Sequence, residues 1–170
     1  MFMWTNAGRA APLALCAAVC FTNGAAAKPA AKAPPARAEI QALYNKINAA
    51  AMQKNVDGVY AYDGDDYTVI DQKGRTHEPS EGRQDLEQAL EVADSVKATT
   101  VIQSFTGTDA EATVTIKDHV AVSVANATTG RAVKITVDDT AREHWVKTED
   151  GWRRTRTRIL SGHNALHKNF

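Results

Sequence analysis

The stretch EHWVKTEDGWRRTRTRIL, residues 143–160, decides the fold, because it predicts two long strands joined by a tight turn. Apolar and polar residues alternate on both sides of residues 149–151, as in a half-buried hairpin. The second run holds arginines at positions 153, 154, 156 and 158. Side chains two positions apart share a strand face, so one face is expected to carry Trp152, Arg154, Arg156 and Arg158.

What these arginines meet depends on the hairpin register, for which there are two choices. If Thr148 pairs with Trp152, like charges lie opposite each other, Arg142 with Arg158 and His144 with Arg156. If Lys147 pairs with Trp152, the opposed pairs are favourable, Trp145 with Arg154 and Glu143 with Arg156. Opposed like charges destabilise a sheet, whereas a cation–π pair and an ion pair contribute roughly 0.5–1 kcal/mol each. The sequence therefore favours the second register.

The favoured register predicts a polar pocket inside the sheet. Glu143 and Trp145 are in phase with Val133, Ile135 and Val137, the apolar face of their strand. Burying a charged group without water or a partner costs several kcal/mol. The charged groups here are therefore expected to be ion-paired, hydrated or exposed to an open pocket. The alternative is a β-bulge at residues 138–139, which would put the arginines on a solvated or dimer-forming outer face.

Seven residues form the expected ligand-binding set. Guanidinium groups bind carboxylates in a forked geometry and indole rings stack on aromatic groups, so the expected ligand is small and anionic or aromatic. The set is Tyr44, Tyr67, Glu143, Trp145, Arg154, Arg156 and Arg158. A structural ion pair that ties two strands together explains the Glu143–Arg156 pair equally well.

No catalytic residue is assigned from the sequence. Carboxylates and a tyrosine crowd one strand entrance (Asp63, Asp65, Asp66 and Tyr67), where a general base or simple turn and capping chemistry would fit. The five histidines are scattered, so no metal site is expected. No cofactor is expected either, because the sequence lacks a glycine-rich phosphate loop, H-E-x-x-H and G-x-S-x-G.

Residues 1–27 are interpreted as a secretory signal, with Arg9, an apolar stretch at 10–21 and small residues at 25–27. The apolar stretch is too short for a bilayer span, which needs roughly 20 residues, so no stable membrane insertion is expected after its removal. The signal predicts that the mature chain is exported, to the periplasm or outside the cell. Because both cysteines lie within the signal, the mature chain is expected to contain no cysteine. Residues 28–37 are predicted to be an extended Pro/Ala/Lys-rich tether.

The charge of the remaining chain argues against nucleic acid as a partner. The chain has 20 basic and 20 acidic side chains, and its four N-terminal basic residues are Arg9, Lys28, Lys32 and Arg37. Residues 38–170 therefore carry a net charge of about −4, whereas a nucleic-acid-binding domain is normally clearly basic.

The predicted elements are helices first and long strands afterwards. Helical spacing covers 38–54, with a short helix from Asp57 to Tyr62 and a third one capped by Ser80. Two short strands flank a turn at 71–74. Strands are then predicted at 97–106, 111–125, 131–147 and 152–161. This order predicts an α+β fold: a curved, cone-shaped antiparallel sheet with three N-terminal helices packed on its concave face.

The element order and the sequence Trp145-Val146-Lys147 … Gly151-Trp152-Arg153 resemble the nuclear transport factor 2-like superfamily. Similarity is greatest to its polyketide cyclase-like and ketosteroid isomerase-like branch, over residues 38–162, with 163–170 as a C-terminal tail. The resemblance implies a cone with an internal pocket and a homodimer through the sheet. With the predicted signal, it indicates an exported domain that binds a small ligand or a protein. The alternatives are a cofactor-independent isomerase, cyclase or hydrolase, and a purely structural dimerisation through the sheet.

Overall fold

The computed structural model of the protein describes residues 34–125 and 132–168. The predicted signal (1–27), most of the predicted tether (28–33) and the turn predicted at 128–130 lie outside the described residues. The elements are, in chain order, α1 (Pro35–Met52), α2 (Val56–Tyr60), β1 (Asp63–Ile70), β2 (Thr76–His77), α3 (Pro79–Glu91), β3 (Ser95–Gly107), β4 (Glu111–Ala125), β5 (Ala132–Thr148) and β6 (Gly151–Lys168).

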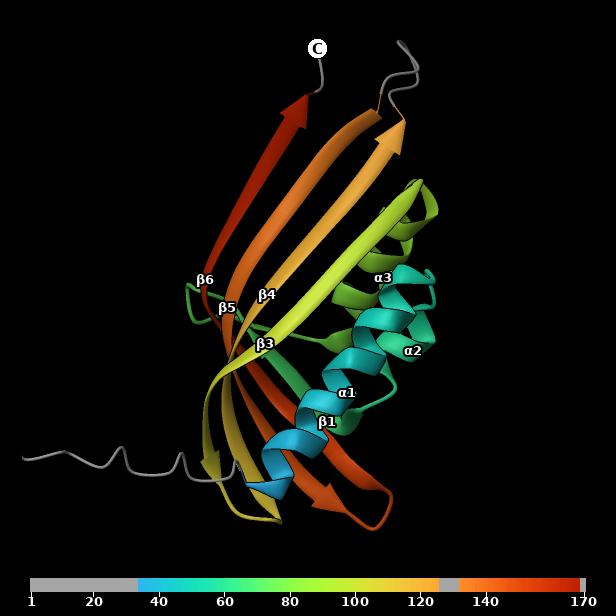
Figure 1. Cartoon of the computed structure of the whole chain (residues 1–170). Helices are drawn as coiled ribbons and strands as arrows, with labels where there is room; N and C mark the ends of the chain where they lie inside the picture. Colours follow the sequence, from blue (N-terminus) through green and yellow to red (C-terminus); the bar gives the residue numbers. More distant parts are fainter. Residues whose placement is uncertain (1–33, 126–131, 169–170) are drawn as a thin grey trace, which may run out of the picture. The chain divides into compact units, whose positions relative to one another are not determined.

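The predicted α+β class is confirmed, with the helices on one face of a curved sheet (Figure 1). The six strands lie in the order β2-β1-β6-β5-β4-β3. All neighbours are antiparallel except β1 and β6, which run parallel, so the sheet is mixed where an antiparallel one was expected. The parallel pair arises because α3 carries the chain from the β1–β2 edge to the opposite edge, and the β3–β6 meander then returns beside β1.

Helix α1 packs on the sheet through an apolar stripe. Its inward residues recur every four positions, at Ala36, Ile40 and Tyr44, and all three are buried. They join the main core with apolar residues of the four long strands, among them Ile102, Ala112, Val114, Ile116, Ala141, Trp145 and Trp152. The helix begins at Pro35, where proline is tolerated in a first turn, so its first three residues belong to the segment that was predicted to be an extended tether.

The other two helices close a smaller apolar cluster. Leu90, Ala93 and Val96 are buried there and contact Val56 of α2 and Val120 of β4. The start of α2 differs from the prediction: Asn55 is the cap, and its side chain accepts a hydrogen bond from the Gly58 amide.

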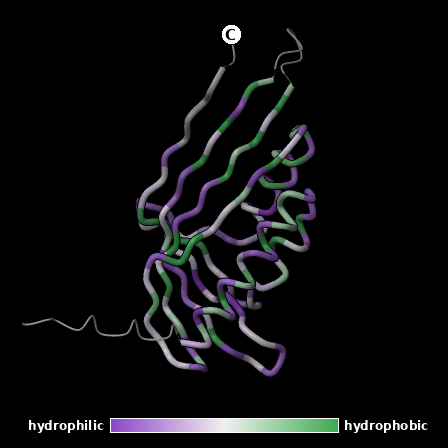
Figure 2. The backbone as a smooth tube through the Cα atoms, viewed as in Figure 1, coloured by the Kyte–Doolittle hydropathy of each residue, from purple (hydrophilic) through white to green (hydrophobic). Residues whose placement is uncertain are grey.

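Along the strands, hydrophobic and hydrophilic residues alternate (Figure 2), so one sheet face is presented to the helices. None of the helices in the described residues is long and apolar enough to cross a membrane.

The β5–β6 hairpin begins in the predicted register and then changes. Lys147 pairs with Trp152 and Trp145 with Arg154, as favoured from the sequence. A bulge at Thr155 follows, so the next partner of β5, His144, lies opposite Arg156. No shift interrupts the β4–β5 pairing at residues 138–139, where the alternative bulge was considered.

Beyond the bulge, each residue of β6 points to the face of the sheet opposite to the one predicted for it. Arg142 lies opposite Arg158, and Glu143 lies opposite Thr157, which is buried. The prediction that Arg156 faces Glu143 is therefore wrong. The physical reason is charge: an unbroken register would turn two further arginines toward an interior that already holds one, and burying each would cost several kcal/mol.

Strand β6 also runs further than predicted. It continues to Lys168, so the segment 163–170, predicted to be a tail, is mostly strand and pairs with β5 as far as Val133. A second register shift precedes this extension, because Ala141 pairs with Ile159 whereas Thr140 pairs with Ser161.

Candidate functional site

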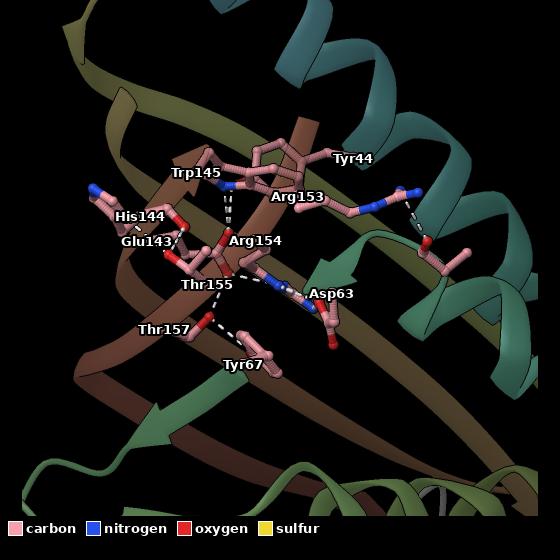
Figure 3. A network of polar contacts seen from close by, with 11 residues as sticks. Tyr44, Asp63, Tyr67, Glu143, His144, Trp145, Arg153, Arg154, Thr155 and Thr157 are labelled. Atoms are coloured by element: carbon pink, nitrogen blue, oxygen red, sulfur yellow. Dashed lines mark hydrogen bonds and ion pairs between the residues drawn. The ribbon is translucent and has the colours of Figure 1, made fainter. Parts of the chain in front are cut away.

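Arg154 is the centre of a buried polar network on the inner face of the sheet (Figure 3). Its Nε and Nη2 atoms lie 2.8 and 2.7 Å from Oδ1 of Asp63, and Nη1 lies 3.0 Å from Oε1 of Glu143. The side chain of Arg154 is only 12% exposed, and those of Asp63 and Glu143 are 9% and 2% exposed. Among the described residues these contacts use three of the five guanidinium N–H bonds, which leaves two for other acceptors.

The carboxylate of Glu143 is fully occupied. Its Oε2 accepts hydrogen bonds from the Tyr44 hydroxyl at 2.5 Å and from Nε1 of Trp145 at 3.1 Å. Its Oε1 accepts from Arg154 and, at 3.1 Å, from the Thr157 hydroxyl. Four donors on one carboxylate fix its position. Glu143 is therefore a positioning group for Arg154 rather than a free base.

Aromatic rings enclose the guanidinium group. Its carbon lies 4.8 Å from the ring centre of Tyr67 and 5.9 Å from that of Trp145, distances typical of cation–π contacts. Tyr44 meets Trp145 edge to face, with ring centres 5.5 Å apart. Tyr67 in turn donates a hydrogen bond to Thr157 at 2.8 Å. These rings restrict the position of the Arg154 guanidinium group.

The protonation states follow from burial and charge. Burial raises the pKa of Tyr67 to about 12 and that of Tyr44 well above its ordinary value, so both remain hydroxyls. Burial alone would lower the pKa of Arg154, but the facing Glu143 more than offsets this and the pKa ends well above its ordinary value. Burial also raises the pKa of Asp63, and the charge of Arg154 opposes that rise.

Five of the seven predicted ligand-binding residues meet in this network: Tyr44, Tyr67, Glu143, Trp145 and Arg154. The other two, Arg156 and Arg158, are exposed on the outer face because of the bulge at Thr155. The acidic cluster divides in the same way: Asp63 points inward, whereas Asp65 and Asp66 are exposed.

A cavity of about 240 Å³ opens beside the network, between the helices and strands β3 and β4. Its walls are largely apolar, with contributions from Ile47, Leu86, Leu90, Val96, Ile116, Val120 and Val122. The polar side chains that line it include Tyr44, Asn48, Thr100, Asp118 and Arg154. A largely apolar hollow with a few convergent polar groups is the usual form of a small-molecule site.

Asp118 is the carboxylate of this cavity and has an unusual state. Its Oδ1 is buried without a hydrogen-bond partner in the described part of the chain. Burial raises its pKa to about 6, and the neighbouring Thr100 side chain opposes part of this rise. A carboxylate with a pKa close to neutrality, on the wall of an apolar cavity, is a candidate acid–base group.

Asp118 was not among the site residues predicted from the sequence, although a signal was present. The residue is in phase with Ile116 and Val120, on the strand face whose other members are apolar. A lone charged residue at an inward position of such a strand predicts either a buried partner or a function.

Arg154 also lines a second hollow of about 300 Å³, between α2, α3 and strands β1 and β2. Tyr60, Tyr67 and His77 share its wall with acidic side chains, Glu78, Glu81 and Asp85. His77 is held between Asp71 and Glu81, with ring nitrogens 3.2 and 3.1 Å from their carboxylate oxygens. This arrangement fixes a turn and the start of α3.

The comparisons with known proteins bear on the fold. Neither a protein-family model nor a curated protein matches the sequence. Solved structures do match. A protein from Kribbella flavida has a TM-score of 0.62 at 19% identity, covering 76% of this chain and 93% of its own. A candidate scytalone dehydratase from Novosphingobium aromaticivorans has a TM-score of 0.58 at 12% identity, covering 78% and 88%.

A third match names the fold. It is a candidate dehydratase of the nuclear transport factor 2-like family from Streptomyces avermitilis, with a TM-score of 0.54 at 11% identity, covering 72% of this chain and 93% of its own. The described domain has the nuclear transport factor 2-like fold. The resemblance seen in the sequence is confirmed at this level. In this nuclear transport factor 2-like domain, the 240 Å³ cavity lies between the helices and the sheet, and Arg154 and Asp118 both line it.

Proposed function

We propose that this domain is an acid–base enzyme that removes a proton from carbon in a small, largely apolar substrate, with Asp118 as the base. The supporting observation is the Oδ1 atom of Asp118, which is buried without a described partner on the wall of the cavity. An unsatisfied buried acceptor costs on the order of 1–3 kcal/mol, and such a cost is commonly associated with a functional role.

The ionisation of Asp118 suits this role. With a pKa of about 6 the carboxylate is mostly ionised at neutral pH, yet it is basic enough to hold a proton during a reaction. Glu143 and Asp63 do not line this cavity, although Oδ2 of Asp63 is also buried without a partner in the described residues. The first accepts four hydrogen bonds, and the second is paired through Oδ1 with Arg154.

Arg154 supplies the complementary charge. When Asp118 takes a proton from a carbon next to a carbonyl group, the electron pair moves to the carbonyl oxygen. The remaining N–H bonds of Arg154, which lines the same cavity, can stabilise that oxygen. Return of the proton to a different carbon completes an isomerisation. Departure of a β-hydroxyl group, which takes the proton back from Asp118 and leaves as water, completes a dehydration.

The size of the cavity limits the substrate. Its 240 Å³ corresponds to about eight water molecules at their liquid volume, and its lining is mostly apolar. We therefore propose a small cyclic or branched hydroxy-ketone as the substrate class. The named neighbours from Streptomyces avermitilis and Novosphingobium aromaticivorans are candidate dehydratases, which supports an elimination of this kind.

Exchange of carbon-bound protons with solvent tests the proposal. The purified protein is incubated in D₂O with cyclohexanone or 3-hydroxycyclohexanone, and loss of the α-proton signal is followed by NMR. We expect catalysed exchange that rises with pH through about 6 and then levels off, because only the ionised form of Asp118 accepts a proton. Asp118→Asn should slow this exchange by about 10²–10⁴-fold.

Asp65→Asn is the matched control, because it removes an exposed aspartate from the same protein and should leave the exchange rate unchanged. Unchanged exchange in Asp118→Asn would reject the assignment of the base. Saturable binding of these ketones without exchange would instead favour the binding domain that was the other expectation from the sequence.

We also propose that the chain is exported, as its first 27 residues indicate. Expressed in full length in a bacterial host with a periplasm, the protein should be found there with the mass of residues 28–170, because small residues at 25–27 suit signal cleavage. Leu15→Arg, which interrupts the apolar stretch, should keep the full-length chain in the cytoplasm. A full-length mass for the unaltered protein in the cytoplasm would contradict export.

A further inference from the structure

The outer face of the sheet carries a cationic hollow that is separate from the cavity described above. Its volume is about 300 Å³, and it is lined by Ile70, Thr113, Arg142, Glu143, His144, Arg156 and Arg158. The carboxylate of Glu143 is bonded on the inner face of the sheet, to Arg154 among others. All three arginines are exposed. Arg154, which belongs to the inner cavity, points to the opposite face of the same strand.

The bulge at Thr155 creates this hollow. It places Arg158 directly opposite Arg142, and Arg156 opposite His144. Groups directly opposed on antiparallel strands have their Cβ atoms about 4.5–5.5 Å apart, so the guanidinium groups can reach a common point. Arg154 precedes the bulge and stays on the inner face, whereas the cations that follow the bulge lie together on the outer face.

The charges in the hollow are not balanced by the protein. None of the three arginines forms an ion pair with a carboxylate in the described residues. His144 does have a carboxylate contact, because its Nε2 lies 2.7 Å from Oε1 of Glu111. Opposed like charges destabilise a sheet, so this arrangement is unfavourable unless an anion occupies it.

We propose that this hollow binds a small molecule through a phosphate group. A phosphate dianion has several oxygens that accept hydrogen bonds, and guanidinium groups match its geometry with two N–H bonds each. Three arginines that face one hollow suit such a group better than a single carboxylate. Residues 38–170 carry a net charge of about −4, which opposes a long polyanion such as nucleic acid.

A second copy of the chain is a less favourable occupant. A two-fold axis through this face would bring the same arginines of both copies together, and their charges would repel. A dimer formed here would still need an anion between the copies. The phosphate site is therefore the primary inference from this face.

Calorimetric titration of the purified protein with inorganic phosphate and with pyrophosphate, at constant ionic strength, tests the site. We expect saturable binding at one site. Arg142→Ala and Arg158→Ala should each weaken it at least 10-fold. Lys134→Ala is the control, because it removes the same charge from an exposed position of β5 outside the hollow and should leave the affinity unchanged.

Thermal unfolding gives a second readout that does not depend on titration heats. Without phosphate, Arg158→Ala should melt at the same or a higher temperature than the unaltered protein, because it removes a repulsive pair. Phosphate should raise the melting temperature of the unaltered protein and not that of the variant. Asp118→Asn should keep phosphate binding, so the outer site is tested independently of the inner one.

Three outcomes would overturn the inference. They are the absence of saturable binding of either anion, an equal loss of affinity in Lys134→Ala, and tighter arginine-dependent binding of a single-stranded oligonucleotide than of pyrophosphate.

Discussion

Arg154→Leu is expected to destabilise the domain by about 3–5 kcal/mol, whereas Arg156→Leu should change its stability by less than about 0.5 kcal/mol. The two arginines are neighbours on one strand face in the sequence pattern, but the structure separates them. Arg154 is buried between Asp63 and Glu143, and Arg156 is exposed on the outer face. Leucine at position 154 leaves two buried carboxylates without their cation. Urea unfolding monitored by tryptophan fluorescence measures both changes.

The pH dependence separates lost charge pairing from lost packing. Without Arg154, protonation of the buried carboxylates relieves their repulsion, so the destabilisation by Arg154→Leu should shrink as the pH falls from 7 to 4. The double variant Arg154→Leu/Glu143→Gln removes one of the stranded charges and should recover part of the loss at neutral pH. A loss of similar size in Arg156→Leu would contradict the inward and outward assignment of the two side chains.

Asp118→Asn is expected to stabilise the protein at neutral pH by about 1–3 kcal/mol. The pKa of Asp118 is raised from 3.8 to about 6, because burial disfavours its charged form. A shift of about two pKa units corresponds to on the order of 3 kcal/mol, which residual solvation reduces. Asparagine has nearly the same shape and no charge to bury. A functional residue that costs stability is a common trade-off.

The sign of the pH dependence follows from the raised pKa. Between about pH 4 and 6 the folded protein holds a proton on Asp118 that the unfolded chain has lost, so stability falls as the pH rises through this window. The advantage of Asp118→Asn should be complete above about pH 6 and absent below about pH 4. Chemical unfolding at several pH values measures it. A variant less stable than the unaltered protein at pH 7.5 would show that the ionised carboxylate has a partner that stabilises it.

Much of the fold is encoded locally. The alternation in β4 and β5, the helical spacing of Ile40 and Tyr44, and the glycine at position 151 with its positive φ of 107° are properties of short segments. The start of the hairpin register was predictable for the same reason, since Trp145 pairs well with Arg154. The predicted set thus contained the main residues of the buried network.

The candidate base could not be assigned with the same rules. Asp118 is a charged residue on an apolar strand face, and alternation alone does not say whether a partner meets it. Its unpartnered oxygen and raised pKa depend on helices distant in sequence that close the cavity. The parallel pairing of β1 with β6 likewise depends on the path of the whole chain.

By itself the sequence determined the α+β class, the long strands and the inward side of β5 and β6 near their turn, because these follow from the period of apolar residues. Only the tertiary structure decided where that period breaks. The bulge at Thr155 leaves Arg154 inward, between Asp63 and Glu143, and turns Arg156 outward, because burying further guanidinium groups would cost several kcal/mol each.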